Sequence, residues 1–107
     1  MASEYKTLFQ GAVPAGGAAT IATVPGGKQW IIGHIVVVNI TGGDLTFQLF
    51  KNGTSAEFSW TNLRTVKAND FDYWDGTETM GDAETWAADA SAGASLYITI
   101  SGDEVTP

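Results

Sequence analysis

Residues 26–40 read GGKQWIIGHIVVVNI and contain the longest apolar run of the chain. Branched residues dominate this run, and such side chains are stiff at χ1 and suit a pleated strand better than a helix. Turn-forming residues precede it at 25–27 and follow it at 41–44. We therefore expect one long central strand. Because residues 35–38 are apolar on both faces, we expect both faces to be covered, by a second sheet or by a neighbouring copy of the chain.

The rest of the chain also favours strands. Thirteen glycines, many threonines and short alternating runs are typical of an all-β domain, and helix signals are nearly absent. The other strands are expected at 5–10, 20–24, 44–51, 56–61, 71–75, 84–88 and 94–101. A two-residue turn at Asn52-Gly53 is expected to join two of them in a hairpin, because both residues tolerate positive φ. Residues 62–69 could be a strand or a loop, and residues 76–82 are expected to form an exposed loop.

These features predict a single jelly-roll-like β-sandwich of about eight short antiparallel strands. A chain of 107 residues is expected to form one domain, 1–107, with flexible or partner-held ends at 1–4 and 102–107. The chain has no cysteine for disulfides, no apolar run that approaches the ~20 residues of a membrane span, and no signal-peptide pattern at its start. We therefore expect no membrane partner.

The net charge of −7 is unevenly distributed. Residues 1–67 hold five bases and three acids, which sum to +2, whereas residues 68–107 hold nine acids and no base, which sum to −9. An acidic half argues against direct binding to nucleic acid, which needs a basic surface. It fits a solvated acidic face, or a basic patch on a partner or a sister subunit.

The segment Asp70–Gly76 is the most acidic and aromatic part of the sequence. A helix-loop-helix calcium site needs acids at positions one, three and five and glycine at six. Here the fifth position is Trp74 and the glycine falls at the seventh. We therefore expect no metal and no cofactor, and interpret the segment as an acidic edge that discourages wrong strand pairing.

The late aromatic residues have three interpretations: a platform for sugar rings with carboxylates nearby, a subunit interface, or core filling. We assign the following residues to an interface: Trp60, Tyr73, Trp74, Trp86, Asp70, Asp72 and Asp75. The single histidine, His34, is expected to be a hydrogen-bonded structural residue of the central strand. With no cysteine and one histidine, the sequence identifies no catalytic residue, and we expect a protein that is not an enzyme.

Several turn and strand segments together carry a resemblance. They are residues 23–28 (TVPGGK), the branched run to 39, residues 41–43 (TGG), residues 51–54 (KNGT), residues 88–94 (ADASAGA) and residues 101–105 (SGDEV). Their order resembles small β-sandwich virion proteins of tailed bacteriophages, which include capsid decoration (cement) proteins and proteins of tails and fibres. Residues 62–81 depart from that pattern in being so aromatic and acidic.

The resemblance implies a structural role in the virion. Decoration proteins of this kind form small oligomers, often trimers, on the outside of the head, where they bridge capsomers of the major capsid protein. The location implied is the capsid surface, after assembly in the host cytoplasm. Two alternatives stay open: a tail or fibre component of the same fold, and a carbohydrate-binding module that takes a surface glycan on exposed tryptophans.

Overall fold

Eight strands form most of the chain in the computed structural model, which describes residues 2–93 and 95–107. The strands are β1 (Ala2–Ala12), β2 (Ala19–Thr23), β3 (Gln29–Asn39), β4 (Leu45–Lys51), β5 (Arg64–Val66), β6 (Phe71–Met80), β7 (Thr85–Ala90) and β8 (Leu96–Thr106). One short 3-10 turn, η1, spans Ala56–Phe58. Within the described ranges, no helix is long and apolar enough to cross a membrane.

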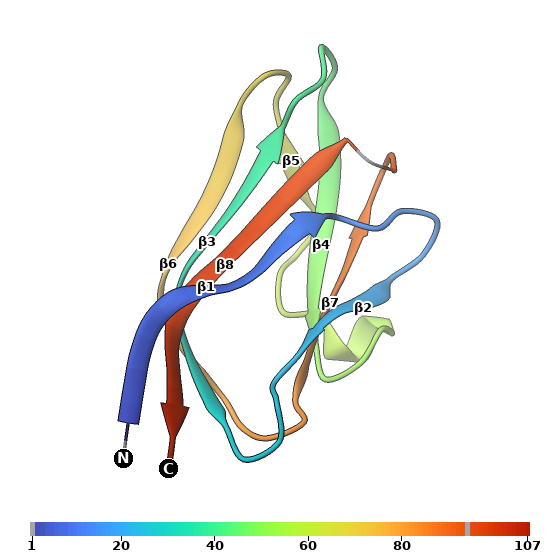
Figure 1. Cartoon of the computed structure of the whole chain (residues 1–107). Helices are drawn as coiled ribbons and strands as arrows, with labels where there is room; N and C mark the ends of the chain where they lie inside the picture. The colour runs from blue at the N-terminus through green and yellow to red at the C-terminus, as the bar shows by residue number, and fades with distance from the viewer. Residues whose placement is uncertain (1, 94) are drawn as a thin grey trace.

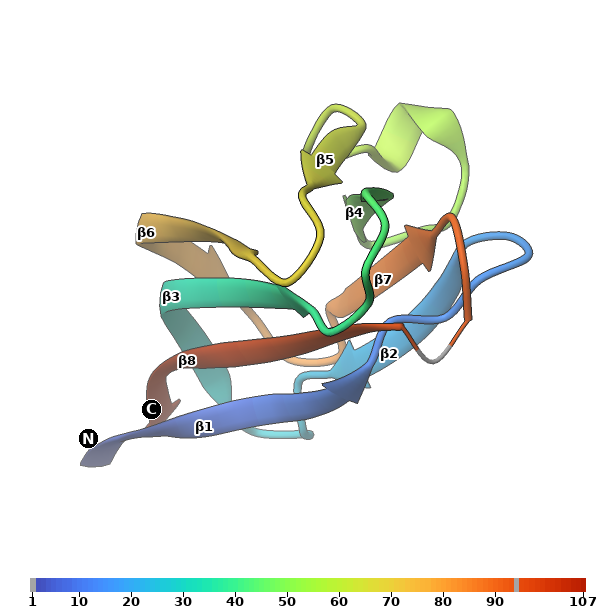
Figure 2. The same cartoon turned by 90° about the horizontal axis from the view of Figure 1, so that it is seen from above.

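The strands form two four-stranded antiparallel sheets that pack face to face (Figures 1 and 2). One sheet has the order β1-β8-β3-β6 and the other has the order β2-β7-β4-β5. Every connection between consecutive strands passes from one sheet to the other, except the one from β4 to β5. This arrangement confirms the predicted all-β, jelly-roll-like sandwich.

The core lies between the sheets, and β3 supplies its centre as the sequence predicted. Alternate side chains of β3 point inward, and Ile32, Ile35 and Val37 are at most 2% exposed. The facing sheet covers only this inner side. On the outer side, Val38 is 38% exposed, and no third layer of described residues covers that face of the strand. The expectation of cover on both faces is therefore met on one face by the second sheet and left open on the other.

The tight two-residue hairpin predicted at Asn52-Gly53 does not form, although residues 59–61 do return beside β4. Asn52 does adopt positive φ (64°), as the turn chemistry requires. Its side chain, however, donates to Glu84 Oε2 (2.7 Å) and accepts from the Thr85 N–H (3.0 Å), which ties the turn to the start of β7. The chain then forms η1, meets β4 at an isolated antiparallel bridge between Ser59 and Phe50, and pairs with β4 as a strand at β5. Tertiary hydrogen bonds have thus overridden a local turn signal.

Three further segments, which the sequence predicted as a loop or as chain ends, lie in strands. Their polar residues do not show the apolar pattern from which a strand is predicted. Residues 76–80 are the end of β6 and not a loop, and Met80 is fully buried opposite Trp30. Residues 102–106 are the second half of β8, paired with both β1 and β3, and residues 2–4 lie in β1. In β1 the register shifts between Thr7 and Phe9, so that Leu8 and Phe9 both pack against the core. At such a bulge, successive side chains need not alternate strictly between the inner and the outer side of the sheet.

Asn39, at the end of β3, is a buried polar side chain whose hydrogen bonds join three segments. It is 1% exposed. Its Nδ2 donates to the carbonyl oxygens of Gly43 (2.8 Å) and Val66 (3.0 Å). Its Oδ1 accepts from the Thr41 N–H (2.9 Å) and hydroxyl (2.8 Å). The amide therefore fixes the turn between β3 and β4 and holds it against β5.

We expect Asn39→Leu to lower the free energy of unfolding by about 3 kcal/mol, because it withdraws a buried donor from two carbonyl oxygens and an acceptor from Thr41. Urea denaturation followed by circular dichroism measures the change. Thr41→Val removes only the hydroxyl contacts and is expected to cost about 1 kcal/mol. Equal losses in the two variants would show that Asn39 contributes no more than the turn itself.

Candidate ligand-binding pocket

A pocket of about 280 Å³ opens between the two sheets, on the side where β5 and β6 are the edge strands. Its floor consists of core side chains from β3 and β4, each no more than 3% exposed: Ile35, Val37, Phe47 and Leu49. The walls and rim come from β5, β6 and the segment between η1 and β5: Trp60, Thr61, Arg64, Asp72, Tyr73 and Trp74. The pocket therefore combines an apolar floor with an aromatic and charged rim.

Two half-buried tryptophans form the aromatic part of the pocket. Trp74 lies opposite Ile35 in the β3–β6 register, which directs it toward the inner side of the sheet. Its ring meets that of Trp60 edge to face, with centroids 4.9 Å apart and an angle of 78°. Trp60 makes a second such contact, at 4.8 Å and 87°, with the fully buried Trp86. The pocket wall is thus anchored on the core.

An ion pair between Arg64 and Asp72 lies at the rim and connects the two sheets. The guanidinium donates through Nε (2.5 Å) and Nη2 (3.1 Å) to the two carboxylate oxygens. This hydrogen bonding from Arg64 lowers the pKa of Asp72 below its ordinary value. The rim therefore carries a fixed donor and a fixed acceptor side by side at neutral pH.

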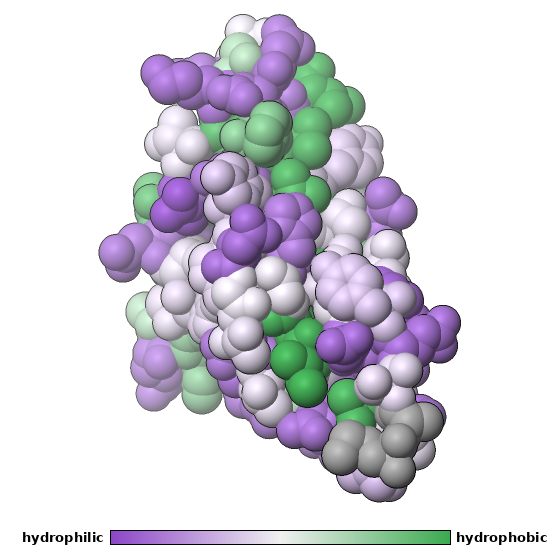
Figure 3. Space-filling view, turned by 90° about the vertical axis from the view of Figure 1, so that its left-hand side faces the viewer, coloured by the Kyte–Doolittle hydropathy of each residue, from purple (hydrophilic) through white to green (hydrophobic). Residues whose placement is uncertain are grey.

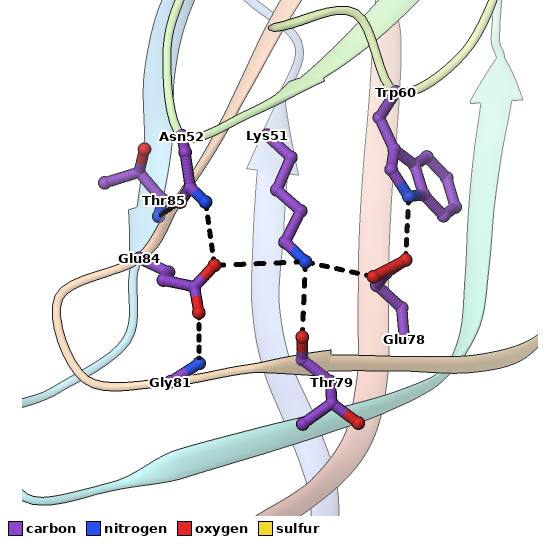
Figure 4. A network of polar contacts seen from close by, with 8 residues as sticks. All are labelled: Lys51, Asn52, Trp60, Glu78, Thr79, Gly81, Glu84 and Thr85. Carbon is purple, nitrogen blue, oxygen red and sulfur yellow. Dashed lines mark hydrogen bonds and ion pairs between the residues drawn. The ribbon is translucent and has the colours of Figure 1, made fainter.

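A second polar network lies beside Trp60 (Figure 4). Lys51 Nζ contacts Glu78 Oε1 (3.0 Å), the Thr79 carbonyl (3.2 Å) and Glu84 Oε2 (3.9 Å). The other oxygen of Glu78 accepts the Trp60 indole N–H at 3.0 Å. Because this hydrogen bond fixes one edge of the indole, Trp60 is held in place at the pocket by groups that lie outside it.

The carboxylates of these networks make stability depend on pH. Burial alone would raise the pKa of Glu78, but hydrogen bonds from Trp60 and Lys51 outweigh it and lower the pKa. The pKa of Glu84 is lowered by hydrogen bonds from Asn52 and from the Gly81 N–H. The native state then binds fewer protons than the unfolded chain near and below the ordinary carboxyl pKa, so stability falls as the pH falls through that range.

We expect the thermal midpoint to be constant above about pH 5 and to fall progressively between about pH 4.5 and 3. Differential scanning calorimetry across that range measures the effect. Glu78→Gln keeps an acceptor for Trp60 but cannot titrate, so it should be less stable than the parent protein at pH 7 and show a shallower acid limb. If the thermal midpoint of Glu78→Gln fell with pH as steeply as that of the parent protein, the titration of Glu78 would not be a cause of the acid destabilisation.

The structure brings four of the seven proposed interface residues to the pocket: Trp60, Asp72, Tyr73 and Trp74. It places Trp86 in the core at 0% exposure, with no surface to offer a partner. Asp70 lies just before β6, where its Oδ1 accepts the Phe71 N–H at 2.8 Å. Arg64 and Thr61 were missed. One sequence feature could have indicated Arg64: it is the only arginine of the chain, and it lies two residues before a valine that is buried in the structure.

The acidic residues of β6 point to different sides of the sheet. Asp72 lies opposite Val37, on the inner side, whereas Asp75 lies opposite His34, on the outer side. Strand alternation therefore separates carboxylates that are close in sequence. Among residues 2–93 and 95–107, no group of three or more His, Cys, Asp and Glu side chains is placed to hold a metal ion.

His34 pairs through Nδ1 with Asp75, so the hydrogen bond expected of this histidine is present. Ser101 lies on the other side of His34 in the β3–β8 register, which gives a row with the residue types of a hydrolytic triad. The described contacts, however, include no hydrogen bond between Ser101 and His34. The row also lies on the outer face of the sheet, whereas the pocket opens between the two sheets.

Two solved structures of infectious bursal disease virus are similar to this chain at low levels. The structure of the Gx strain shares 16% identity over 96% of this chain, with a TM-score of 0.45, and that of the Gt strain shares 16% over 96%, with a TM-score of 0.35. This chain spans only 31% and 32% of the two viral chains. No protein-family model and no curated protein matches the sequence. Similarity this low assigns no function.

Proposed function

We propose that the protein is a non-enzymatic structural component of a virion, and that it decorates the outside of a tailed-phage head and bridges neighbouring capsomers. Two features support this proposal before any surface is considered. The turn and strand segments of the sequence resemble small β-sandwich virion proteins. The jelly-roll-like sandwich is also an architecture on which viral capsid and lectin domains are built.

The observation that carries the proposal is the uncovered outer face of the β1-β8-β3-β6 sheet, which we call the outer aromatic face. Its apolar members, in adjacent rows of the register, are Val36, Val38, Phe71, Tyr73 and Tyr97. Phe71 is 56% exposed and Tyr73 58% exposed. Figure 3 looks onto this side of the molecule, where green and pale residues lie between purple ones. Exposed aromatic residues gathered on one flat face are typical of protein interfaces.

The proposed mechanism is adhesion through repeated contacts. Each apolar contact contributes about 25 cal/mol per Å² of area removed from water, so a modest footprint per subunit gives modest affinity. In a trimer, three such footprints act together, and the effective concentration of the second and third sites makes dissociation slow. The acidic half of the chain adds long-range attraction to a basic partner surface.

The test is the location of the protein in particles. In a density gradient of lysate from infected cells, we expect the protein to sediment with DNA-filled heads, and gold-labelled antibody to decorate heads in electron micrographs. Protein that stays at the top of the gradient would contradict a virion role. Label confined to tails would overturn the decoration assignment in favour of the alternative, a tail or fibre component.

A matched pair of variants tests the surface that carries the proposal. Phe71→Ser removes an aromatic ring from the outer aromatic face, and we expect about tenfold weaker binding to heads assembled without the protein. Leu63→Ser removes an apolar side chain that is somewhat more exposed (68%) and lies outside that sheet, just before β5, and should change binding less than twofold. Equal effects in the two variants would show that the face is not the binding surface.

A further inference from the structure

We propose that the pocket between β5 and β6 binds a single pyranose ring of a glycan. This inference does not rest on the virion role, because the pocket opens between the sheets and not on the outer aromatic face. It rests on the size of the pocket, on the character of the surface that a ligand would meet, and on the polar groups at its rim.

The size of the pocket favours a small, compact ligand. Its volume of about 280 Å³ is at or just below the lower end for small-molecule sites, which is roughly 300–1,000 Å³. The site is also preformed, because its walls are fixed by ring contacts and by the Trp60–Glu78 hydrogen bond. One sugar ring, with the rest of a glycan extending into solvent, suits these dimensions.

The surface offered to a ligand is aromatic and polar, even though the floor is aliphatic. The floor residues are almost completely buried, so a ligand meets mainly Trp60 and Trp74, together with Thr61 and the Arg64–Asp72 pair, whereas the Tyr73 ring lies on the outer side beside that of Phe71. A pyranose has an apolar C–H face that packs on an indole, and hydroxyls around its edge. Its hydroxyls can donate to the Asp72 carboxylate and accept from the Arg64 guanidinium at the same time.

The rim also discriminates against the alternative occupant, an apolar side chain from a partner protein. Arg64 uses two of its N–H groups in the ion pair. Its side chain is 51% exposed, which leaves its remaining N–H groups accessible to solvent. An apolar group over this rim would strip water from the ion pair without replacing the lost hydrogen bonds. Vicinal hydroxyls replace them, so the observed rim favours a sugar.

The test is an NMR titration of the ¹⁵N-labelled protein with the methyl glycosides of glucose, galactose, mannose, rhamnose and N-acetylglucosamine. We expect at least one of them to shift the indole N–H signals of Trp60 and Trp74, with a Kd of about 1 mM or weaker. The Trp30 indole, bonded to Glu104 at 3.0 Å and absent from the pocket lining, should not move. If none of the five glycosides shifts the pocket signals at 50 mM, the proposal is wrong.

Two aspartates of β6 provide matched variants. Asp72→Asn changes a pocket carboxylate and should weaken binding of the responding glycoside at least tenfold. Asp75→Asn makes the same change at an ion-paired aspartate on the outer side of the same strand and should alter the Kd less than twofold. The reverse order would place the sugar on the outer face and overturn the proposal.

A variant that moves a wall of the pocket provides a second check. A Cβ at Gly76 would lie 2.6 Å from the Trp74 indole, so Gly76→Ala must displace that ring while leaving it in the chain. We expect the same tenfold loss of sugar binding. Titration with benzyl alcohol tests the competing occupant, an apolar side chain. If benzyl alcohol shifts the pocket signals and none of the glycosides does, the pocket is an apolar cleft and the sugar assignment is wrong.

Discussion

Replacing Gly102 with alanine is expected to lower the midpoint of thermal unfolding by more than about 10 °C. A Cβ at this position would lie 2.2 Å from the carbonyl oxygen of Ile31 and 2.9 Å from Cα of Ile32. Both are backbone atoms of β3, so no side chain can turn away and the two strands must separate. We expect a loss of about 3 kcal/mol, and each kcal/mol corresponds to roughly 4–8 °C in a domain of this size.

Gly42→Ala is the matched control, because a Cβ there has no heavy atom within 4 Å. It should leave the midpoint unchanged or raise it slightly, since alanine reduces the freedom of the unfolded chain. Circular dichroism melts of the two variants and the parent protein measure both effects. A Gly102→Ala midpoint within 2 °C of the parent would mean that β3 and β8 are not in this close contact.

The position of Gly102 shows one limit of prediction from the sequence. Residues 102–107 (GDEVTP) are mostly polar or turn-forming and follow an obvious strand, so the sequence suggests a tail. In the structure this segment lies between β1 and β3, and the glycine is there because neighbouring backbone leaves no room for a side chain. A close approach between distant segments has no local signature, whereas the branched apolar run that located β3 and the alternation that located β4 are local.

The same difference between local patterns and long-range contacts explains which features of the candidate pocket could be predicted from the sequence. The sequence indicated its aromatic residues and Asp72, because unusual residue types are visible without a structure. It could not indicate that Arg64 and Asp72 lie in different sheets and meet across the opening between them. Nor could it separate Trp74, which lines the pocket, from Trp86, which the sandwich encloses. Which side of a strand faces the core depends on the register of both sheets.

Trp86→Ala is expected to lower the free energy of unfolding by about 3–5 kcal/mol, which would leave little of the stability of a domain this small. The side chain is fully buried, belongs to the core cluster and supports Trp60 from below through their edge-to-face contact. Its removal therefore leaves a large cavity and loosens the pocket wall at the same time. Chemical denaturation in urea, with the midpoint and slope fitted together, measures the loss.

Two variants show whether burial is the cause. Trp74→Ala removes the same side chain from a half-buried site at the pocket wall, and should cost about half as much as Trp86→Ala. Trp86→Phe should be tolerated better than most core substitutions, because the Trp86 indole N–H finds no acceptor among the described residues and its loss breaks no hydrogen bond. If Trp74→Ala were instead the more damaging of the two alanine variants, Trp74 would be the enclosed residue, and the pocket assigned to the β5–β6 side could not exist in the form described.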